Sequence, residues 1–230
     1  MNKTKIEYVD YTWNPVVGCL HGCPYCYARR IAERFKGGKE YPLGFEPTSH
    51  LSKRINEPML VKKPSKIFVC SMADLFGSWS WKVPWSGGKV TGDDVINAIL
   101  FVVRKCPQHT FMFLTKNPTG YLKYDFPENA WLGMTVTHLE GKRVIYGGDK
   151  GGKRFVSLEP LLGGPDGEIE FRNIDLLIIG AQTGPGAVKP KPEWVQGIID
   201  EARAHKIPVF LKDNLKWPEQ IREFPEVSHG

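Results

Sequence analysis

The sequence predicts an α/β fold, built as a partial (β/α) TIM-like barrel of parallel strands. Short, continuous apolar runs recur along the chain, and apolar stripes at helical spacing lie between several of them. Strands that alternate with helices form βαβ units, and such units build parallel sheets. Six or seven strands suffice for an incomplete barrel, in which functional side chains gather at the carboxyl ends of the strands.

The predicted strands are apolar runs that suit burial on both faces. They are Thr12–Val17, Ile67–Cys70, Thr110–Leu114, Ala130–Val136, Phe155–Leu158, Leu176–Ile179 and Pro208–Leu211. Apolar residues on one helical face predict three helices, over residues 28–35, 95–103 and 194–202. The second of these helices follows Thr91, a suitable capping residue.

Composition places the chain in a broad class. With 230 residues, of which 41% are apolar, it can build one substantial core, so we expect a single domain over residues 1–230. No apolar run is long enough to span a membrane, and the first twenty residues lack the apolar core of a secretory signal, so we expect a cytoplasmic protein. The net charge of +6 favours a polyanionic partner, although the basic residues are scattered, as on an ordinary solvated surface.

The cysteines are the most informative residues. Three of the five, Cys19, Cys23 and Cys26, stand within eight positions in a C-x-x-x-C-x-x-C pattern. Three thiolates from one loop can hold a 4Fe–4S cluster and leave one iron open to another ligand. Gly18 and Gly22 suit a loop that wraps around such a cluster, and the loop leads directly into the first predicted helix.

The full pattern, C-x-x-x-C-x-aromatic-C with Tyr25 as the aromatic residue, resembles the signature of the radical SAM superfamily. This resemblance implies a radical SAM barrel and a 4Fe–4S cluster on Cys19, Cys23 and Cys26. It also implies S-adenosylmethionine as the second cofactor, cleaved reductively to methionine and a 5′-deoxyadenosyl radical. An electron donor such as a flavodoxin or ferredoxin would supply the electron, and Tyr25 would pack near the adenine.

Longer stretches are similar to a phage-associated family of radical SAM-like proteins. They are residues 12–19, 71–76, 114–116, 157–161 and 178–180. Radical SAM enzymes often carry Gly-Gly-Glu after the second strand, whereas this chain has Ser71-Met72-Ala73-Asp74 there. By position, Ser71 and Asp74 become candidates for cofactor binding, and Thr135 and Thr137 become candidates for holding the ribose.

Other polar residues also follow predicted strands. We expect Lys116 and Glu159 to face the cofactor and substrate cavity and to take part in catalysis, because a carboxylate at a dry barrel mouth can bind a cation or relay a proton. The two could also pair with each other. Gly180 and Gln182 are further candidates for cofactor binding, and Lys212 is as consistent with a structural salt bridge as with function.

Alternative functions remain open at this point. Zinc on the three cysteines and His50, His109 or His138 would make a metal-stabilised module that binds nucleic acid. An iron–sulfur electron carrier or redox sensor would keep the cluster without the cleavage reaction. We expect Cys70 and Cys106 to be buried in the core instead.

The substrate is not specified by the motif. The basic charge favours a nucleic acid or a nucleotide. Trp79, Trp81 and Trp85 could stack on bases, although we favour ordinary packing for these three side chains.

Overall fold

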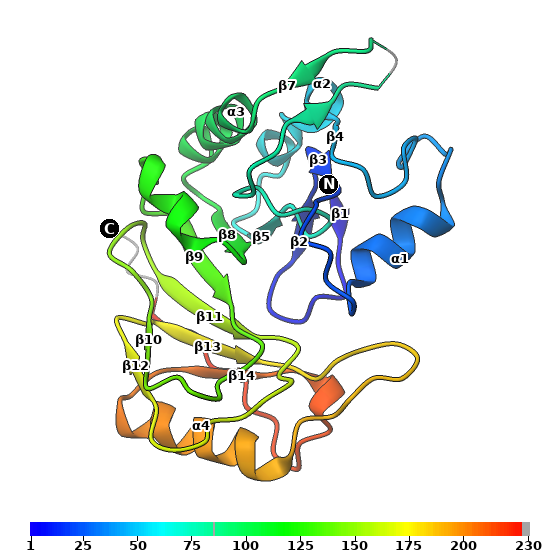
Figure 1. The fold of residues 1–230 in the computed structure, drawn as a ribbon. Helices are drawn as coiled ribbons and strands as arrows, with labels where there is room; N and C mark the ends of the chain where they lie inside the picture. Colours follow the sequence, from blue (N-terminus) through cyan, green and yellow to red (C-terminus); the bar gives the residue numbers. More distant parts are fainter. Residues whose placement is uncertain (85, 227–230) are drawn as a thin grey trace. The chain divides into compact units, whose positions relative to one another are not determined.

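A computed structural model describes residues 1–84 and 86–226 (Figure 1). The chain divides into two compact units, Met1–Trp131 and Leu132–Gly230. Strand β9 (Ala130–Thr135) crosses this boundary. The expected single domain over the whole chain stays a prediction.

The first unit is built on a mostly parallel set of strands. Strand β2 (Tyr11–Trp13) pairs in parallel with β5 (Lys66–Val69), and β5 pairs in parallel with β8 (Thr110–Thr115). The short strand β1 (Asn2–Lys3) adds to β2 in the antiparallel direction. Because the carboxyl ends of parallel strands meet at one edge, residues that follow β5 and β8 lie close together.

Three helices and a small second sheet complete this unit. The helices are α1 (Tyr27–Arg34), α2 (Leu51–Arg54) and α3 (Gly92–Lys105), with the 3-10 turns η1 (Glu57–Leu60) and η2 (Pro118–Lys123). The small sheet contains β3 (Val16–Val17), β4 (Thr48–Ser49), β6 (Trp81–Lys82) and β7 (Lys89–Val90). Helix α3 is capped at its N-terminus by Thr91, whose hydroxyl accepts a hydrogen bond from the Asp94 amide at 3.1 Å.

The second unit repeats the parallel pattern. Strand β9 pairs with β11 (Arg154–Leu158), which is followed by β13 (Leu176–Ile179) and β14 (Val209–Leu211), all in parallel. Helix α4 (Pro192–Ala204) lies along one side of these strands (Figure 1). The unit also contains the parallel pair β10 (Val144–Tyr146) and β12 (Glu170–Arg172) and the turn η3 (Asp213–Leu215).

Alternation along the strands explains how the second unit forms its core. Val156 and Leu158 on β11, with Leu177 and Ile179 on β13, join the apolar face of α4 in one buried cluster. The intervening positions on β11, including Ser157, point to the opposite face, because successive side chains of a strand alternate. The same alternation brings Glu159, just after β11, onto the face that α4 does not cover.

The prediction of an α/β fold with a large, mostly parallel sheet is confirmed. Each predicted apolar run contains a strand. The run Thr12–Val17 is divided, however: β2 ends at Trp13 and β3 belongs to the small sheet. Asn14 and Pro15 separate them, since Pro15 has no amide to donate and the Asn14 side chain accepts from the Met72 amide at 3.1 Å.

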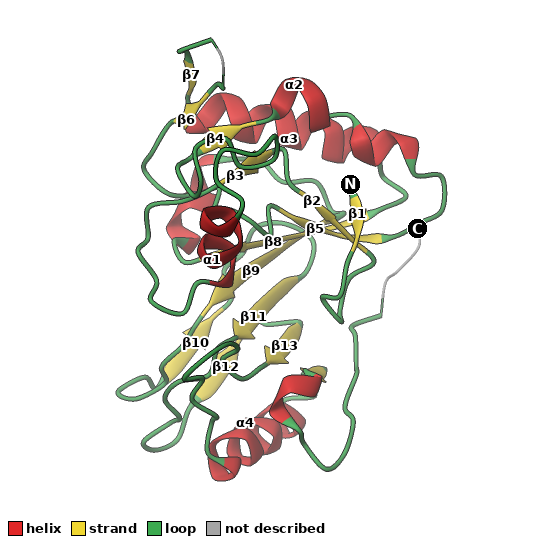
Figure 2. Ribbon diagram, turned by 90° about the vertical axis from the view of Figure 1, so that its right-hand side faces the viewer, coloured by secondary structure: helices red, strands yellow, loops and turns green. Residues whose placement is uncertain are grey.

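The connections are simpler than the sequence pattern suggested. Loops rather than helices join several of the strands (Figure 2).

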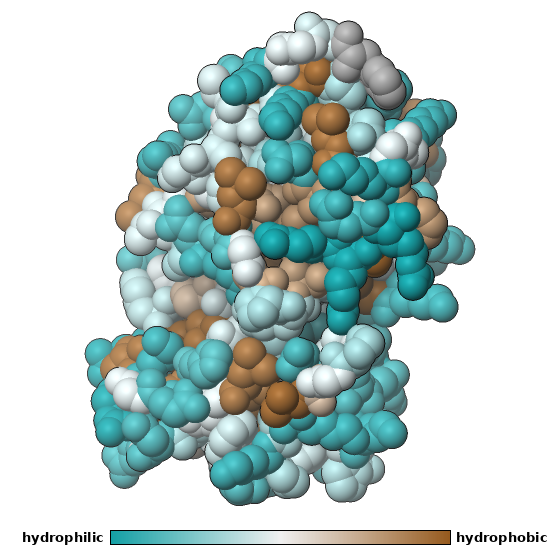
Figure 3. All heavy atoms as spheres, turned by 45° about the vertical axis from the view of Figure 1, so that its right-hand side comes forward, coloured by the Kyte–Doolittle hydropathy of each residue, from teal (hydrophilic) through white to brown (hydrophobic). Residues whose placement is uncertain are grey.

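Among the described residues, no helix is long and apolar enough to cross a membrane. On the face shown in Figure 3, hydrophobic residues form separate patches among hydrophilic ones.

Candidate functional site

The three motif cysteines lie in the loop between β3 and α1, and all three are partly buried. Cys26 caps α1, and its sulfur accepts a hydrogen bond from the Arg29 amide at 3.3 Å. Gly18 opens the loop with a positive φ of 83°, and a Cβ there would lie 2.4 Å from the Phe45 carbonyl oxygen. Only glycine therefore fits at Gly18, and the loop begins at a fixed position.

The surroundings of Cys19 disfavour an unpaired thiolate. Burial raises the pKa of Cys19 to about 11, a hydrogen bond from the His21 backbone lowers it, and the nearby Cys26 and Asp74 raise it further. A thiolate at this position therefore needs a cationic partner, and a metal centre supplies one.

The donor set fits an iron–sulfur cluster in its chemistry: three partly buried thiols stand on one short loop. Across residues 1–84 and 86–226, no group of three or more His, Cys, Asp or Glu side chains is arranged to hold a single metal ion. In a 4Fe–4S cluster each thiolate binds a different iron, so its ligands need not converge on one point.

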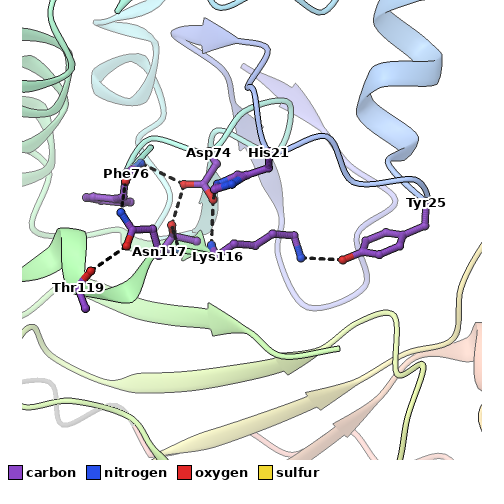
Figure 4. A network of polar contacts seen from close by, with 8 residues as sticks. His21, Tyr25, Asp74, Phe76, Lys116, Asn117 and Thr119 are labelled. Carbon is purple, nitrogen blue, oxygen red and sulfur yellow. Dashed lines mark hydrogen bonds and ion pairs between the residues drawn. The ribbon is translucent and has the colours of Figure 1, made fainter. Parts of the chain in front are cut away.

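Asp74, just beyond β5, is the centre of a polar network (Figure 4). One carboxylate oxygen accepts from the Thr115 hydroxyl at 2.7 Å and from the Phe76 amide at 3.0 Å. The other accepts from the Lys116 amide at 2.9 Å and lies 2.9 Å from His21 Nε2. The carboxylate thus connects the ends of β5 and β8 to the cysteine loop.

The hydrogen bonds decide the charge state of this carboxylate. Burial by itself would raise the pKa of Asp74. The hydrogen bonds from His21, the Lys116 amide, Thr115 and the Phe76 amide outweigh it and lower the pKa below its usual value. Asp74 is therefore an anion with its acceptors in use, and it holds the loop through His21.

Lys116 reaches the same loop from the end of β8. Its ammonium donates to the Tyr25 hydroxyl at 2.8 Å and lies 5.2 Å from the centre of the Tyr25 ring (Figure 4). Tyr25 stands between Cys23 and Cys26, so this contact joins the end of β8 to the cysteine loop. Two residues that are 91 positions apart are thereby brought together.

Ser71 contributes to the packing around the loop. Its hydroxyl lies 3.3 Å from both the oxygen and the nitrogen of the Asn14 side chain. Its carbonyl accepts from the Tyr27 hydroxyl at 2.7 Å, which links the end of β5 to α1. Ser71 is thus placed beside the helix that Cys26 caps.

The second unit carries the other charged candidate. Glu159, just after β11, forms an ion pair with Lys212, just after β14, and both are largely buried. A Cβ at Gly180, just after β13, would lie 3.0 Å from Lys212 Cδ and 3.2 Å from Glu159 Cγ. The glycine between the two strand ends thus leaves room for the pair.

The remaining candidates also belong to the second unit. Thr135 pairs in register with Ser157, whose buried hydroxyl has no hydrogen-bond partner among the described residues. The Thr137 carbonyl accepts from the Leu162 amide at 2.8 Å. The Gln182 side chain accepts from the Val188 amide at 3.1 Å and so orders the loop after β13.

The sequence-predicted residues therefore form two groups. Tyr25, Ser71, Asp74 and Lys116 surround the cysteine loop in the first unit, whereas Glu159 and Gly180 meet Lys212 in the second. The partners that the structure shows for Lys116 and Glu159 are Tyr25 and Lys212, and the predicted pairing of Lys116 with Glu159 stays a prediction.

Two contributors were missed in the sequence. The sequence pattern gives His21 no functional role, yet this side chain joins the loop to Asp74. Asn14 had no role, although its place directly after a strand is the same signal that selected Lys116 and Glu159. A polar residue directly after a strand is therefore the feature in the sequence that identifies Asn14 as a candidate.

Residues considered for other roles are mostly structural. Cys70 and Cys106 are buried, as expected. His109 lies in the core, with Nε2 3.1 Å from the Val61 carbonyl oxygen. Burial and the nearby Arg54 lower the pKa of His50 to about 4, and His138 is exposed.

The tryptophans follow the expectation of packing where the structure describes them. Trp81 is fully buried, and Trp79 packs edge-on against it with ring centres 6.3 Å apart. Trp79 also contacts the ring of His21 at 5.1 Å. Trp85 lies outside the described residues.

Comparison with known proteins identifies the family. No curated protein and no solved structure matches the chain. A family model described as "Protein of unknown function (DUF5131)" matches residues 3–227, almost the whole length. The chain therefore belongs to the DUF5131 family.

Proposed function

We propose that this protein is a radical SAM enzyme. One observation carries the proposal: a C-x-x-x-C-x-aromatic-C loop presents three partly buried thiols directly beside polar residues that follow β5 and β8. That position suits chemistry at the carboxyl ends of parallel strands. The proposal includes the finer form of the fold, a partial (β/α) TIM-like barrel of the radical SAM type.

In this proposal Cys19, Cys23 and Cys26 hold a 4Fe–4S cluster. When bound, the cluster would pass one electron to S-adenosylmethionine, which would divide into methionine and a 5′-deoxyadenosyl radical. Asp74 serves as a positioning residue, because its bond to His21 fixes the middle of the loop. Its other bonds anchor it to the ends of β5 and β8.

Tyr25 and Lys116 orient the other half of the loop. The Lys116 ammonium fixes the Tyr25 phenol, so that one ring face can pack against the adenine. Ser71 keeps the end of β5 next to α1.

The sequence also predicts residues of the second unit as ligands of the cofactor. Glu159 would bind an ammonium or ribose group of the cofactor or relay a proton, with Lys212 holding the carboxylate in place. Thr135, Thr137, Gly180 and Gln182 would line the cofactor. The net charge of +6 supports a nucleic acid or nucleotide as the substrate.

Product analysis tests this function. Protein reconstituted anaerobically with iron and sulfide, reduced with dithionite and mixed with S-adenosylmethionine should give 5′-deoxyadenosine and methionine in equal amounts. Cys26→Ala should give neither product. A fully loaded protein that forms no 5′-deoxyadenosine would point to an electron carrier or redox sensor, and stoichiometric zinc without iron would point to the zinc-stabilised module.

A further inference from the structure

Helix α1 exposes its large apolar side chains. Tyr27, Ile31 and Phe35 follow one another at every fourth position, and Ile31 is 39% and Phe35 57% exposed. The side chains that the helix buries are the small Ala28 and Ala32. This distribution is opposite to that of an ordinary surface helix, which buries its large apolar residues.

The exposure is concentrated in one segment. Ten large apolar side chains are well exposed among the described residues, and four of them lie between residues 20 and 35. These four are Leu20 in the cysteine loop, Tyr27 and Ile31 on α1, and Phe35, which caps the C-terminal end of α1. Single exposed apolar residues need no explanation, but a helical row of them indicates an interaction surface.

Positive charge borders this row. Arg30 and Arg34 stand on α1 one turn apart, and Lys36 and Lys39 follow the helix; all four are exposed. The nearby carboxylates have partners within the protein: Glu33 accepts from the Phe45 amide at 2.9 Å and lies 3.8 Å from the Lys36 ammonium, and Glu40 pairs with Arg54. A partner therefore meets an apolar centre with a basic border.

We propose that the outer face of α1, formed by Tyr27, Ile31, Phe35 and the bordering Arg30 and Arg34, docks an acidic protein that carries single electrons. The identity of the partner as a redox protein rests on the proposed function. Apolar and aromatic residues with arginine at the border are typical of protein interfaces. The acidic character follows from charge complementarity.

The other occupants fit this face less well. A second copy in a two-fold interface would bring the same basic border against itself, since such interfaces use one patch on both subunits. Nucleic acid would satisfy the arginines and its bases could stack on Tyr27 and Phe35, but it would leave the aliphatic Leu20 and Ile31 without an apolar partner. The row begins directly after Cys26, so a carrier on α1 lies beside the loop that needs the electron.

Direct binding tests this surface without any activity. Helix α3 provides a matched control: Phe101 is 58% exposed, and Lys105, four positions later, lies 5.7 Å from its ring. Reduced flavodoxin, an acidic one-electron carrier, is titrated into wild type, Phe35→Ser, Arg34→Glu, Phe101→Ser and Lys105→Glu, with fluorescence anisotropy as the readout. The two α1 variants should weaken binding at least about tenfold, while the two α3 variants stay near wild type.

Comparing product formation with dithionite and with flavodoxin as the reductant distinguishes a failure of the docking surface from a failure of the proposed function. With dithionite, all four variants should form 5′-deoxyadenosine at the wild-type rate; with flavodoxin as reductant, only the α1 variants should be slow. Equal flavodoxin binding by Phe35→Ser and Phe101→Ser would overturn the docking surface. The docking surface would also be overturned if the α1 variants no longer bound a single-stranded 30-mer DNA but still bound flavodoxin as wild type does. If wild type forms no product even with dithionite, the proposed function fails, while the binding titration still decides whether α1 docks an acidic protein.

Discussion

Asp74 shows how one buried residue can fix a loop that has no regular secondary structure. The cysteine loop is held from outside by the His21–Asp74 contact and the Lys116–Tyr25 contact, which join residues 53 and 91 positions apart. The carboxylate is anchored in turn by amides and a hydroxyl from the ends of β5 and β8. The sequence could nominate Asp74 by its place after a strand, but the partner across the fold had no local signal.

Replacing Asp74 with Asn should therefore destabilise the protein. The amide has one oxygen where the carboxylate has two, so at least one buried donor loses its acceptor. The expected loss in the free energy of unfolding is about 1–3 kcal/mol, measured by urea denaturation. Asp166→Asn, at an exposed carboxylate, should leave the free energy of unfolding close to that of wild type; equal losses in the two variants would contradict the role of Asp74.

The pH dependence of unfolding should report the same carboxylate. The pKa of Asp74 is lower in the folded protein than its usual value, so its stabilising contribution is complete above that usual value, about 4. The contribution is lost as the pH falls through the lower pKa of the folded state. The difference in unfolding free energy between wild type and Asp74→Asn should thus be constant just above pH 4 and shrink below it. A difference that grows on acidification would mean that the folded carboxyl is protonated more easily.

Two glycines of the cysteine loop allow a matched test of steric fit. Both have positive φ, but a Cβ at Gly18 would lie 2.4 Å from the Phe45 carbonyl oxygen, whereas a Cβ at Gly22 has no atom within 4 Å. Gly22→Ala should cost only the backbone strain, about 1–3 kcal/mol. Gly18→Ala should cost clearly more, as measured by thermal unfolding, and similar costs would show that the start of the loop is not constrained as described.

Local sequence patterns predicted which strands exist, and they were less successful where one apolar run is divided between two strands. The buried strands β5, β8, β11 and β13 all lie within one residue of the predicted runs. The run Thr12–Val17 did not remain one strand, because the break depends on a contact between Asn14 and the Met72 amide, which is far away in the sequence. Continuous apolar runs report burial, but they do not report which sheet the residues join.

Helix α4 offers a test of the helix assignment itself. Gly197 lies in the interior of α4, is exposed, and has no atom within 4 Å of a Cβ built on it. Glycine costs a helix interior up to about 1 kcal/mol relative to alanine. Gly197→Ala should therefore raise the free energy of unfolding by roughly 0.5–1 kcal/mol in urea denaturation. A loss of stability would mean either that the backbone at residue 197 is not helical or that its surroundings leave no room for a methyl group.

On the scale of the whole molecule, each unit presents its own set of strand-end residues. The first set centres on the cysteine loop and Asp74, and the second on the Glu159–Lys212 pair. The sequence predicted which residues follow strands, because that depends on local apolar runs. It could not predict that Glu159 pairs with Lys212 or that Gly180 makes room for them, since these contacts depend on the order of β11, β13 and β14 in the sheet.

The most direct test of the central claim is the metal content of protein reconstituted anaerobically with iron and sulfide. Wild type should bind about four irons and four sulfides per chain, as one 4Fe–4S cluster requires. Cys19→Ala, Cys23→Ala and Cys26→Ala should each lose the cluster, whereas Cys106→Ala, at a buried thiol outside the loop, should keep it. Stoichiometric zinc without iron, or full iron loading in the loop variants, would contradict the account.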